Sequence, residues 1–326
     1  MPDQTSQQMQ CMEVWGGSQL IAQGVEFGGL DAWVYSKPFG DAQRGGDVYY
    51  ASSCATGRIS RLLLADVSGH GNSVASTAAD LRTLMRRFVN HLDQGEFVRR
   101  LNGQFSALSR DGSFATALVT TYFAPSRRLT VCNAGHPRPL LYRAGRRHWS
   151  LLCHKRSETG PASGSHNIPL GIIAISEYEH FDVELESGDC LLAYTDALIE
   201  SRDADGEMLG EAGLLKIMRA LVIPATGGNF RIDPRKITEQ LLAEIAARHP
   251  ANLTHDDVTV LSVRASDREP NYSVGDKLKA AGRFIRTLVG SLNPVAERAP
   301  FPDISLANIG GAIIPALGRR WRAPSE

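Results

Sequence analysis

The segment GGDVYYASSCATGRISRLLLADVSGHG, residues 45–71, gives the clearest indication of the fold. We expect an extended strand over 47–53, a turn, and a second strand over 58–65, because two runs of strand-forming residues flank a short Gly-containing connection. Strands joined this closely pair antiparallel. The segment therefore predicts a β-hairpin with Asp47 at its head and Asp66 at its end.

Two helices are predicted after the hairpin. Apolar residues recur at spacings of three and four between Val74 and Leu92, and a second series runs from Phe97 to Leu108. This spacing places the apolar side chains on one face of each helix. A pair of such helices predicts a layer that covers one face of a sheet.

Strand-forming residues dominate the next part of the chain, in short runs bounded by Gly or Pro. We expect the last two runs to form another hairpin around Ser187-Gly188, and residues 153–168 to form an exposed loop. Strands are predicted over residues 114–123, 129–133, 140–143, 149–152, 181–186 and 189–194.

A second pair of helices and a final strand complete the predicted elements. One helix covers residues 211–221, and Asp233-Pro234 begins the other as an N-cap followed by proline at the first helical position. The final strand covers residues 258–263. Hairpins combined with paired helices predict an α+β fold, an antiparallel β-sandwich with helices packed on both outer faces in α-β-β-α layers.

The chain divides into three predicted parts. Residues 1–30 show little periodicity and are expected to be an N-terminal lead-in, and residues 31–265 form the main domain. Residues 266–326 form a basic, Pro-containing tail. We expect this tail to be poorly ordered; the alternative is one short amphipathic helix over 276–290 that associates with an acidic partner or an anionic membrane.

Composition excludes several classes of protein. Lys+Arg and Asp+Glu both number 35 among 326 residues, which argues against nucleic-acid binding through bulk positive charge. The five cysteines are scattered, so a disulfide framework or zinc site is not expected and a reducing compartment fits best. We find neither a signal peptide nor an apolar stretch of membrane-spanning length, and therefore expect a cytoplasmic protein.

Four aspartates at predicted strand ends are the candidate functional residues. Carboxylates that converge in a partly buried site repel one another, and divalent cations relieve that repulsion. Ligands that are all oxygen favour Mg²⁺ or Mn²⁺ over zinc or copper. Taken singly, an aspartate at a strand end is more often a turn former or a helix cap than a metal ligand, and spacing alone does not bring the four together. The four are Asp47, Asp66, Asp196 and Asp256.

Seven short motifs, in this order and at suitable spacing, carry a family resemblance. They are Gly45-Gly46-Asp47, Asp66-Val67-Ser68-Gly69-His70-Gly71, Asn133-Ala134-Gly135-His136-Pro137, Pro169-Leu170-Gly171, Gly188-Asp189, Tyr194-Thr195-Asp196 and Asp256-Asp257-Val258-Thr259. The chain resembles the metal-dependent serine/threonine phosphatases of the SpoIIE/RsbU branch, relatives of protein phosphatase 2C. The resemblance covers residues 30 to 265.

The resemblance implies a site as well as a β-sandwich fold. Asp66 would bridge two divalent cations, Mn²⁺ or Mg²⁺, and the carbonyl of Val67 would assist one of them. Asp47, Asp196 and Asp256 would supply the other carboxylates. Asp66 and Asp196 are the candidate catalytic residues, and the cations would activate a water molecule for in-line attack on phosphorus.

Three residues near these proposed ligands have other expected roles. Asp256 is preferred to Asp257, because side chains alternate along an extended segment and only one of the two should point into the site. Arg44, three residues before Asp47, is the candidate clamp for the substrate phosphate, although most surface arginines are only solvated. His136 is expected to make a structural hydrogen bond to backbone.

The sequence departs from the family pattern at three positions. Ala197 stands where the family usually has Gly, which would strain the loop if that position needs positive φ. Tyr50 stands where many relatives carry another Asp. Ser68 occupies the place of a proton-donating His in the wider family, so a histidine general acid is not expected.

Two functions of different kinds remain open at this point. The resemblance implies hydrolysis of phosphoserine or phosphothreonine on a partner protein, with a STAS-type anti-sigma-factor antagonist as the substrate type and bacterial partner switching as the setting. Control would come from a separate partner, self-association or the basic tail. The alternative, motivated by Ala197 and Tyr50, is a catalytically weak module that only binds a regulatory partner. A sugar or nucleotide phosphatase is disfavoured because the sequence has no Gly-rich P-loop.

Overall fold

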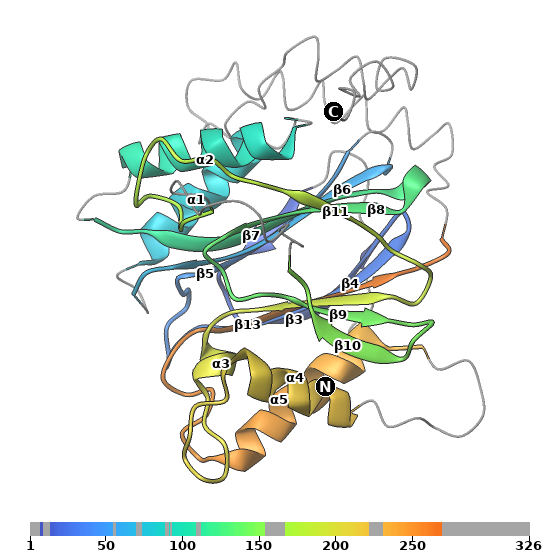
Figure 1. Ribbon diagram of the computed structural model, residues 1–326. Coiled ribbons are helices and arrows are strands. Elements are labelled where there is room, and N and C mark those ends of the chain that lie inside the picture. Colours follow the sequence, from blue (N-terminus) through green and yellow to red (C-terminus); the bar gives the residue numbers. More distant parts are fainter. Residues whose placement is uncertain are drawn as a thin grey trace, which may run out of the picture.

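The computed structural model describes residues 7–8, 14–54, 57–69, 74–88, 91, 93–108, 112–153, 167–221 and 231–268. Two β-sheets face each other, and helices cover both outer faces (Figure 1). The predicted exposed loop over 153–168 and the predicted C-terminal tail lie almost entirely outside these residues. No helix in the described parts is long and apolar enough to cross a bilayer.

The first sheet has seven strands, and they come from both ends of the described chain. Its order is β1 (Gln7–Gln8), β3 (Ile21–Phe27), β4 (Leu30–Lys37), β13 (Val258–Ala265), β12 (Cys190–Tyr194), β9 (Leu140–Arg143) and β10 (His148–Leu151). β1 pairs with β3 in parallel, and the other neighbours pair antiparallel.

The second sheet has six strands and is antiparallel throughout. The predicted hairpin lies within it, because β5 and β6 pair antiparallel from Asp47 opposite Asp66 to Cys54 opposite Ile59. The order is β11 (Phe181–Glu184), β8 (Arg128–Ala134), β7 (Ala115–Phe123), β6 (Ile59–Val67), β5 (Asp47–Cys54) and β2 (Val14–Gly17).

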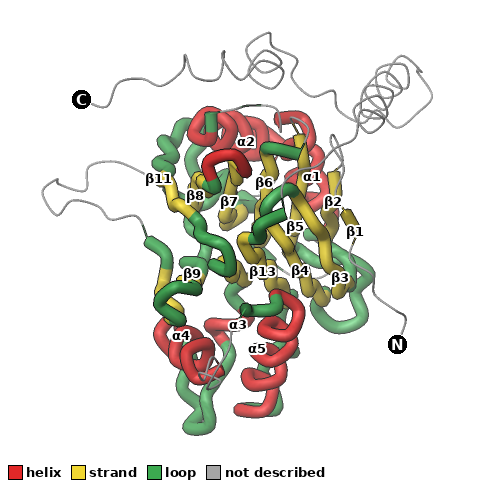
Figure 2. Tube along the Cα trace, turned by 90° about the vertical axis from the view of Figure 1, so that its right-hand side faces the viewer, coloured by secondary structure: helices red, strands yellow, loops and turns green. Residues whose placement is uncertain are grey.

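Helices α1 (Ala75–Phe88) and α2 (Gln94–Leu108) cover the second sheet, and α4 (Gly210–Leu221) and α5 (Pro234–Arg248) cover the first (Figure 2). The short helix α3 (Ala197–Glu200) follows β12, and the 3₁₀ turn Ala124–Ser126 joins β7 to β8. The N-cap of α5 is formed as predicted, since the Asp233 side chain accepts from two backbone N–H groups of the first turn.

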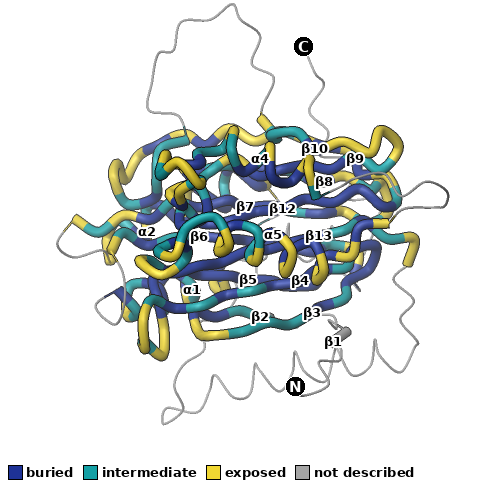
Figure 3. The backbone as a smooth tube through the Cα atoms, turned by 90° about the horizontal axis from the view of Figure 1, so that it is seen from below, coloured by how far each residue is buried: buried dark blue, intermediate teal, exposed yellow. Residues whose placement is uncertain are grey.

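Three apolar layers follow from this arrangement and from the alternation of side chains along each strand. On β5, Tyr49 packs between the two sheets, whereas Val48 and Tyr50 pack toward α1 and α2. A third layer lies between the first sheet and α4–α5. The strands of both sheets are largely buried and exposure is concentrated in the connections (Figure 3). The α-β-β-α sandwich predicted from the sequence is therefore confirmed.

Two predictions about individual elements are wrong. Residues 181–194 do not form a hairpin, because β11 pairs with β8 in one sheet and β12 pairs with β13 and β9 in the other. The turn at Gly188 carries the chain across the sandwich, which a sequence pattern does not distinguish from a turn within one sheet. The buried carboxylate of Asp189 fixes this corner by accepting from the backbone N–H groups of Glu186 and Ala144.

Residues 14–30 are not a mere lead-in, since β2 and β3 belong to the two sheets and β4, which was not predicted, begins at Leu30. One glycine of this segment, Gly16, is required by packing. A Cβ at Gly16 would lie 2.6 Å from the backbone oxygen of Tyr49 on β5, so only glycine lets the edge strand approach this closely.

Candidate active site

The first two candidate aspartates lie side by side at one end of the second sheet. Asp47 begins β5 and is the direct cross-strand partner of Asp66 near the end of β6. Directly opposed residues project from the same face of a sheet with Cβ atoms about 4.5–5.5 Å apart. Alternation along β6 places Asp66 on the same face as Leu64 and Leu62, which pack between the sheets. Both carboxyl groups therefore face the first sheet.

The other two candidates lie on the first sheet at the same end of the sandwich. Asp196 lies two residues after the end of β12, Asp256 lies two residues before the start of β13, and these two strands pair antiparallel. A hydrogen bond joins the sheets at this point, because the Thr195 hydroxyl donates to Asp47 Oδ2 at 2.9 Å. All four aspartates predicted from the sequence thus gather at one end of the sandwich.

The electrostatics of these carboxyls show how close together they lie. Burial, followed by the charges of Asp196, Asp256, Asp257 and Glu200, raises the pKa of Asp66 to about 8. The pKa of Asp47 is also raised well above its usual range, first by burial and then by the charge of Asp66.

The pKa of Asp196 is raised to about 6 by burial, Glu200 and Asp256. Without a compensating cation, this end of the sandwich therefore disfavours full ionisation.

The described residues contain no ready-made cluster of three acidic, histidine or cysteine side chains that could hold a metal ion. The four carboxyl groups lie near one another without converging on one point. The donor set itself is all carboxylate and carbonyl oxygen, which suits Mg²⁺ or Mn²⁺.

Asp257 holds the backbone of the loop before β5, and its surroundings differ from those of Asp256. It is buried, and its carboxylate accepts from the backbone N–H groups of Phe39 and Gly46, both at 2.6 Å. A Cβ at Gly45 would lie 2.4 Å from the same carboxyl group. Asp257 therefore holds the Gly-Gly loop that positions Asp47. Asp256, which is only half-buried, lies at the end of the strand beside Asp66 and Asp196.

Gly46 brings the two strands of the hairpin together at the site. A Cβ at this residue would lie 2.9 Å from the carbonyl oxygen of Val67, and the Val67 N–H donates to the Gly46 carbonyl at 3.3 Å. This contact keeps the Val67 carbonyl beside the loop that carries Asp47. The position is compatible with the ligand role that the sequence implied for Val67.

A family model described as Stage II sporulation protein E (SpoIIE) matches residues 57–266 of the chain. The chain belongs to the SpoIIE family. This family is a branch of the PP2C-type protein serine/threonine phosphatases, so the predicted family and enzyme class are both confirmed.

Several solved structures share this fold. The RsbU and RsbW domains of a Mycobacterium tuberculosis protein are 21% identical, with a TM-score of 0.58, over 84% of this chain and 75% of that one. The SiaA-PP2C domain of Pseudomonas aeruginosa is 18% identical, with a TM-score of 0.56, over 72% and 84%. RsbX, solved in complex with magnesium, is 16% identical, with a TM-score of 0.51, over 76% and 100%.

Two of the three departures from the family pattern, Ala197 and Tyr50, have simple structural explanations. Ala197 is the first residue of α3 and does not have positive φ, so the expected strain is absent. Tyr50 packs in the layer beneath α1 and α2, on the opposite face of β5 from Asp47. A carboxylate at residue 50 would therefore point away from this site.

Glu200 is a site residue that sequence reasoning missed. Its charge contributes to the raised pKa values of both Asp66 and Asp196. The signal was present in the sequence, because Glu200 follows Asp196 by four residues and residues so spaced share one side of a helix. The helix that joins them, α3, has only four residues and has no hydrophobic periodicity to reveal it.

His136 is structural, as expected, and its buried ring makes a hydrogen bond to a side chain. Its Nδ1 lies 2.9 Å from the hydroxyl of Thr116, the cross-strand partner of Asp66, and the Asn133 side chain fixes the turn. Burial lowers the pKa of His136 to about 3. The imidazole is therefore neutral at physiological pH.

Proposed function

We propose that the chain hydrolyses phosphoserine or phosphothreonine on a partner protein, with water as the nucleophile and two divalent cations, Mn²⁺ or Mg²⁺, as cofactors. The observation that carries this proposal is the meeting of four strand-end aspartates, from both sheets, at one end of the sandwich. A partly buried acidic group of this size, with raised pKa values at Asp47, Asp66 and Asp196, is typical of a catalytic site and is hard to explain by stability alone.

The proposed ligands are Asp47, Asp66, Asp196, Asp256 and the carbonyl of Val67. When bound, the cations would supply Lewis-acid chemistry that activates a water molecule and neutralises charge on the phosphoryl oxygens. Magnesium in RsbX, a protein of the same fold, agrees with this choice of metal.

Asp66 has the central role among these residues. Burial and then the charges of Asp196 and Asp256 raise its pKa, and Asp47 is its cross-strand partner. Asp66 therefore lies next to acidic residues of both sheets. We therefore assign Asp66 as the shared ligand of both cations and Asp196 as its catalytic partner. A proton for the leaving serine oxygen does not come from His136, which is neutral and buried.

Arg44 is retained as a candidate contact to the substrate phosphate. It is exposed and lies three residues before Asp47. A guanidinium group suits this role because its planar fork matches two phosphate oxygens.

The proposed substrate is a phosphoprotein of the STAS-type anti-sigma-factor antagonist class, acting in cytoplasmic partner switching. The similarity to a protein that carries both RsbU and RsbW domains supports this setting. Self-association is a further proposal about how activity is controlled.

Hydrolysis of p-nitrophenyl phosphate and of a phosphoprotein with Mn²⁺ tests the function directly. We expect Asp66→Ala to reduce kcat/KM by about a hundredfold or more, because it removes the shared ligand. Asp182→Ala, on the exposed face of β11, is the matched control and should retain activity. Equal rates in wild type and Asp66→Ala would refute the proposal.

The binding-only alternative has lost the two features that motivated it, since neither Ala197 nor Tyr50 disturbs the site. Calorimetry separates it from the enzyme. If the wild-type chain binds no Mn²⁺ at millimolar concentration, the catalytic proposal fails and the binding module is favoured.

A further inference from the structure

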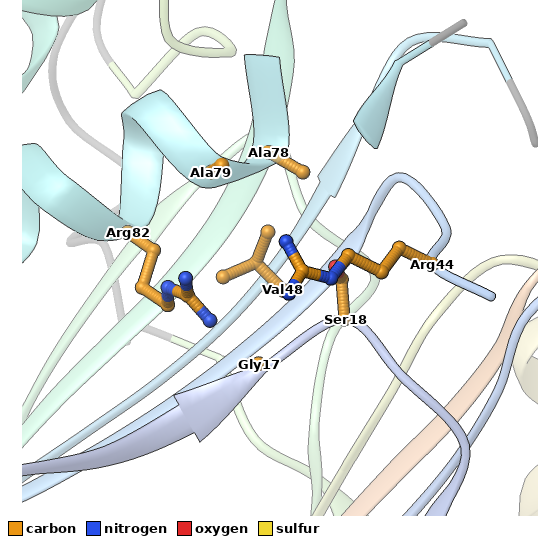
Figure 4. A pocket seen from close by; sticks show the side chains of 7 residues that line it. All are labelled: Gly17, Ser18, Arg44, Val48, Ala78, Ala79 and Arg82. Carbon is orange, nitrogen blue, oxygen red and sulfur yellow. The ribbon is translucent and has the colours of Figure 1, made fainter. Parts of the chain in front are cut away.

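Two arginines meet over a shallow hollow between helix α1 and the strands β2 and β5 (Figure 4). Arg44 comes from the loop before β5 and Arg82 from the middle of α1, and their guanidinium groups face one another across the hollow. Small residues and Val48 form its floor, and most of them are buried. The lining residues are Gly17, Ser18, Arg44, Val48, Ala78, Ala79 and Arg82.

Neither guanidinium is paired with a carboxylate in the part of the chain that the structure describes. Arg82 donates to the carbonyl of Gly16 at 3.4 Å, and Arg44 makes no ion pair there. Burial and the charges of Arg44 and Arg86 lower the pKa of Arg82. Two cations facing each other without an acidic neighbour raise the energy of the folded chain, and a bound anion would reverse that effect.

The position of the hollow limits what the anion can be. Arg44 is three residues from Asp47, and an extended chain spans about 3.3–3.6 Å per residue. The Cα atoms of the two residues therefore lie within about 10 Å of each other. On an extended phosphopeptide the same distance separates a phosphoserine from a side chain about three residues away. A group bound in the hollow can therefore belong to the same substrate segment as the reacting phosphate.

We propose that Arg44 and Arg82 form a docking site for a second anionic group of the phosphoprotein substrate, close in sequence to its phosphoserine or phosphothreonine. The proposal rests on the proposed function. Both an Asp or Glu carboxylate and a second phosphate present paired oxygens that a guanidinium fork binds. Arg44 lines the hollow and lies only three residues before Asp47 in the chain, whereas Arg82 belongs to the hollow alone.

The test measures how Arg82→Gln changes peptide preference in the full chain. Three phosphoserine peptides are compared: one with Asp at the flanking positions, one with a second phosphoserine, and one with Ala. We expect wild type to favour both anionic peptides, and Arg82→Gln to lose about three- to tenfold in kcat/KM on these alone, the range for a partly exposed charged pair. Hydrolysis of p-nitrophenyl phosphate should be unchanged.

Two further variants show whether the effect comes from the guanidinium. Arg82→Lys keeps the charge without the fork and should recover part of the preference. Arg87→Gln, on the same helix with its guanidinium over the Phe88 ring, is the matched control and should behave as wild type. Thermal unfolding of each variant checks that the fold is intact. The peptide on which Arg82→Gln loses more kcat/KM shows whether the hollow prefers a carboxylate or a second phosphate.

Peptide binding, followed by fluorescence anisotropy, keeps this inference separate from the proposed function. If the chain hydrolyses none of these substrates but Arg82→Gln weakens binding of the anionic peptides alone, the docking site stands and the catalytic proposal falls. An unchanged preference in Arg82→Gln would overturn the docking site. So would an equal loss on p-nitrophenyl phosphate, because Arg82 would then act on the reacting phosphate or on the fold.

Discussion

At the scale of single residues, the raised pKa values of the site predict how metal binding depends on pH. The pKa of Asp66 is about 8 and that of Asp196 about 6, both above the usual carboxyl range, so each carboxyl is protonated below its raised pKa. A cation must displace those protons. The apparent affinity for Mn²⁺ should therefore rise as pH increases from 6 to 8, with release of protons.

Calorimetry in two buffers of different ionisation enthalpy measures this release. The observed enthalpies should differ between the buffers at pH 6.5 and converge as the pH passes 8. An affinity that does not change across this range would show that the carboxyls are already ionised before the cation binds.

A second prediction at this scale concerns the hydrogen bonds of the Thr195 side chain. Its hydroxyl donates to Asp47 and accepts from the N–H of Thr259, and all three groups are buried. Thr195→Val leaves a buried acceptor and a buried donor unpaired, which costs about 1–3 kcal/mol. It also removes a hydrogen bond that lowers the pKa of Asp47, so Mn²⁺ affinity should fall.

Thr130→Val is the control for this substitution, because its hydroxyl donates to Asp182 at the exposed surface. Chemical denaturation should show a change within about 0.5 kcal/mol for this variant. Equal losses of stability in the two variants would mean that the hydrogen bond between the sheets contributes no more to the free energy of unfolding than one at the surface.

The residues of the site were predictable to different degrees. Strand-end aspartates and Gly-rich neighbours stand out in the sequence, and the structure brings Asp47, Asp66, Asp196 and Asp256 to one end of the sandwich. Alternation alone predicted that Asp256 and Asp257 would point in different directions, and Asp257 is the one that is buried against the loop before β5. The contribution of Glu200 could not, because it depends on a one-turn helix that only the folded chain reveals.

At the scale of elements, local patterns identified strands and helices but not always their partners. The α1 and α5 helices and the β5–β6 hairpin have strong periodicity or clear caps, and they occur as predicted. The turn at Gly188 has an ordinary hairpin signature, yet it connects two different sheets. Pairing between distant strands is decided by packing, which a local pattern does not contain.

The loop before β5 gives a prediction at this scale. A Cβ at Gly45 would lie 2.4 Å from the buried carboxyl of Asp257, which holds the loop through backbone N–H groups. Gly45→Ala should therefore destabilise the chain by about 1–3 kcal/mol and reduce phosphatase activity with it. Denaturant unfolding and p-nitrophenyl phosphate hydrolysis measure the two effects.

Gly103, within α2, is the matched control for this substitution. A Cβ there meets nothing within 4 Å, so Gly103→Ala should stabilise the helix by about 0.5–1 kcal/mol and leave activity unchanged. If Gly45→Ala proves as harmless as Gly103→Ala, the contact between the loop and Asp257 does not position Asp47.

At the scale of the whole molecule, the site exists only when the two sheets are packed together. Asp47 and Asp66 belong to one sheet, and Asp196 and Asp256 lie on strands of the other. A cation that binds this set therefore binds the folded sandwich and not its separate halves. Metal binding and folding must be coupled, because a ligand that binds only the folded state stabilises it.

This coupling predicts a thermal shift. Mn²⁺ at about 100 times its dissociation constant should stabilise the chain by about 2.7 kcal/mol. For a domain of this size that corresponds to a rise of about 5–10 °C in Tm, which differential scanning calorimetry measures. Asp66→Ala should abolish the rise, because the shared ligand is lost.

The control separates metal binding from stability in general. Asp233→Ala removes the N-cap of α5, far along the chain from the four aspartates, and should lower Tm by an amount equivalent to about 1 kcal/mol. Its response to Mn²⁺ should nevertheless equal that of wild type. A rise in Tm that survives in Asp66→Ala would place the cation elsewhere in the molecule, and the carboxylates shared between the sheets would then need another explanation.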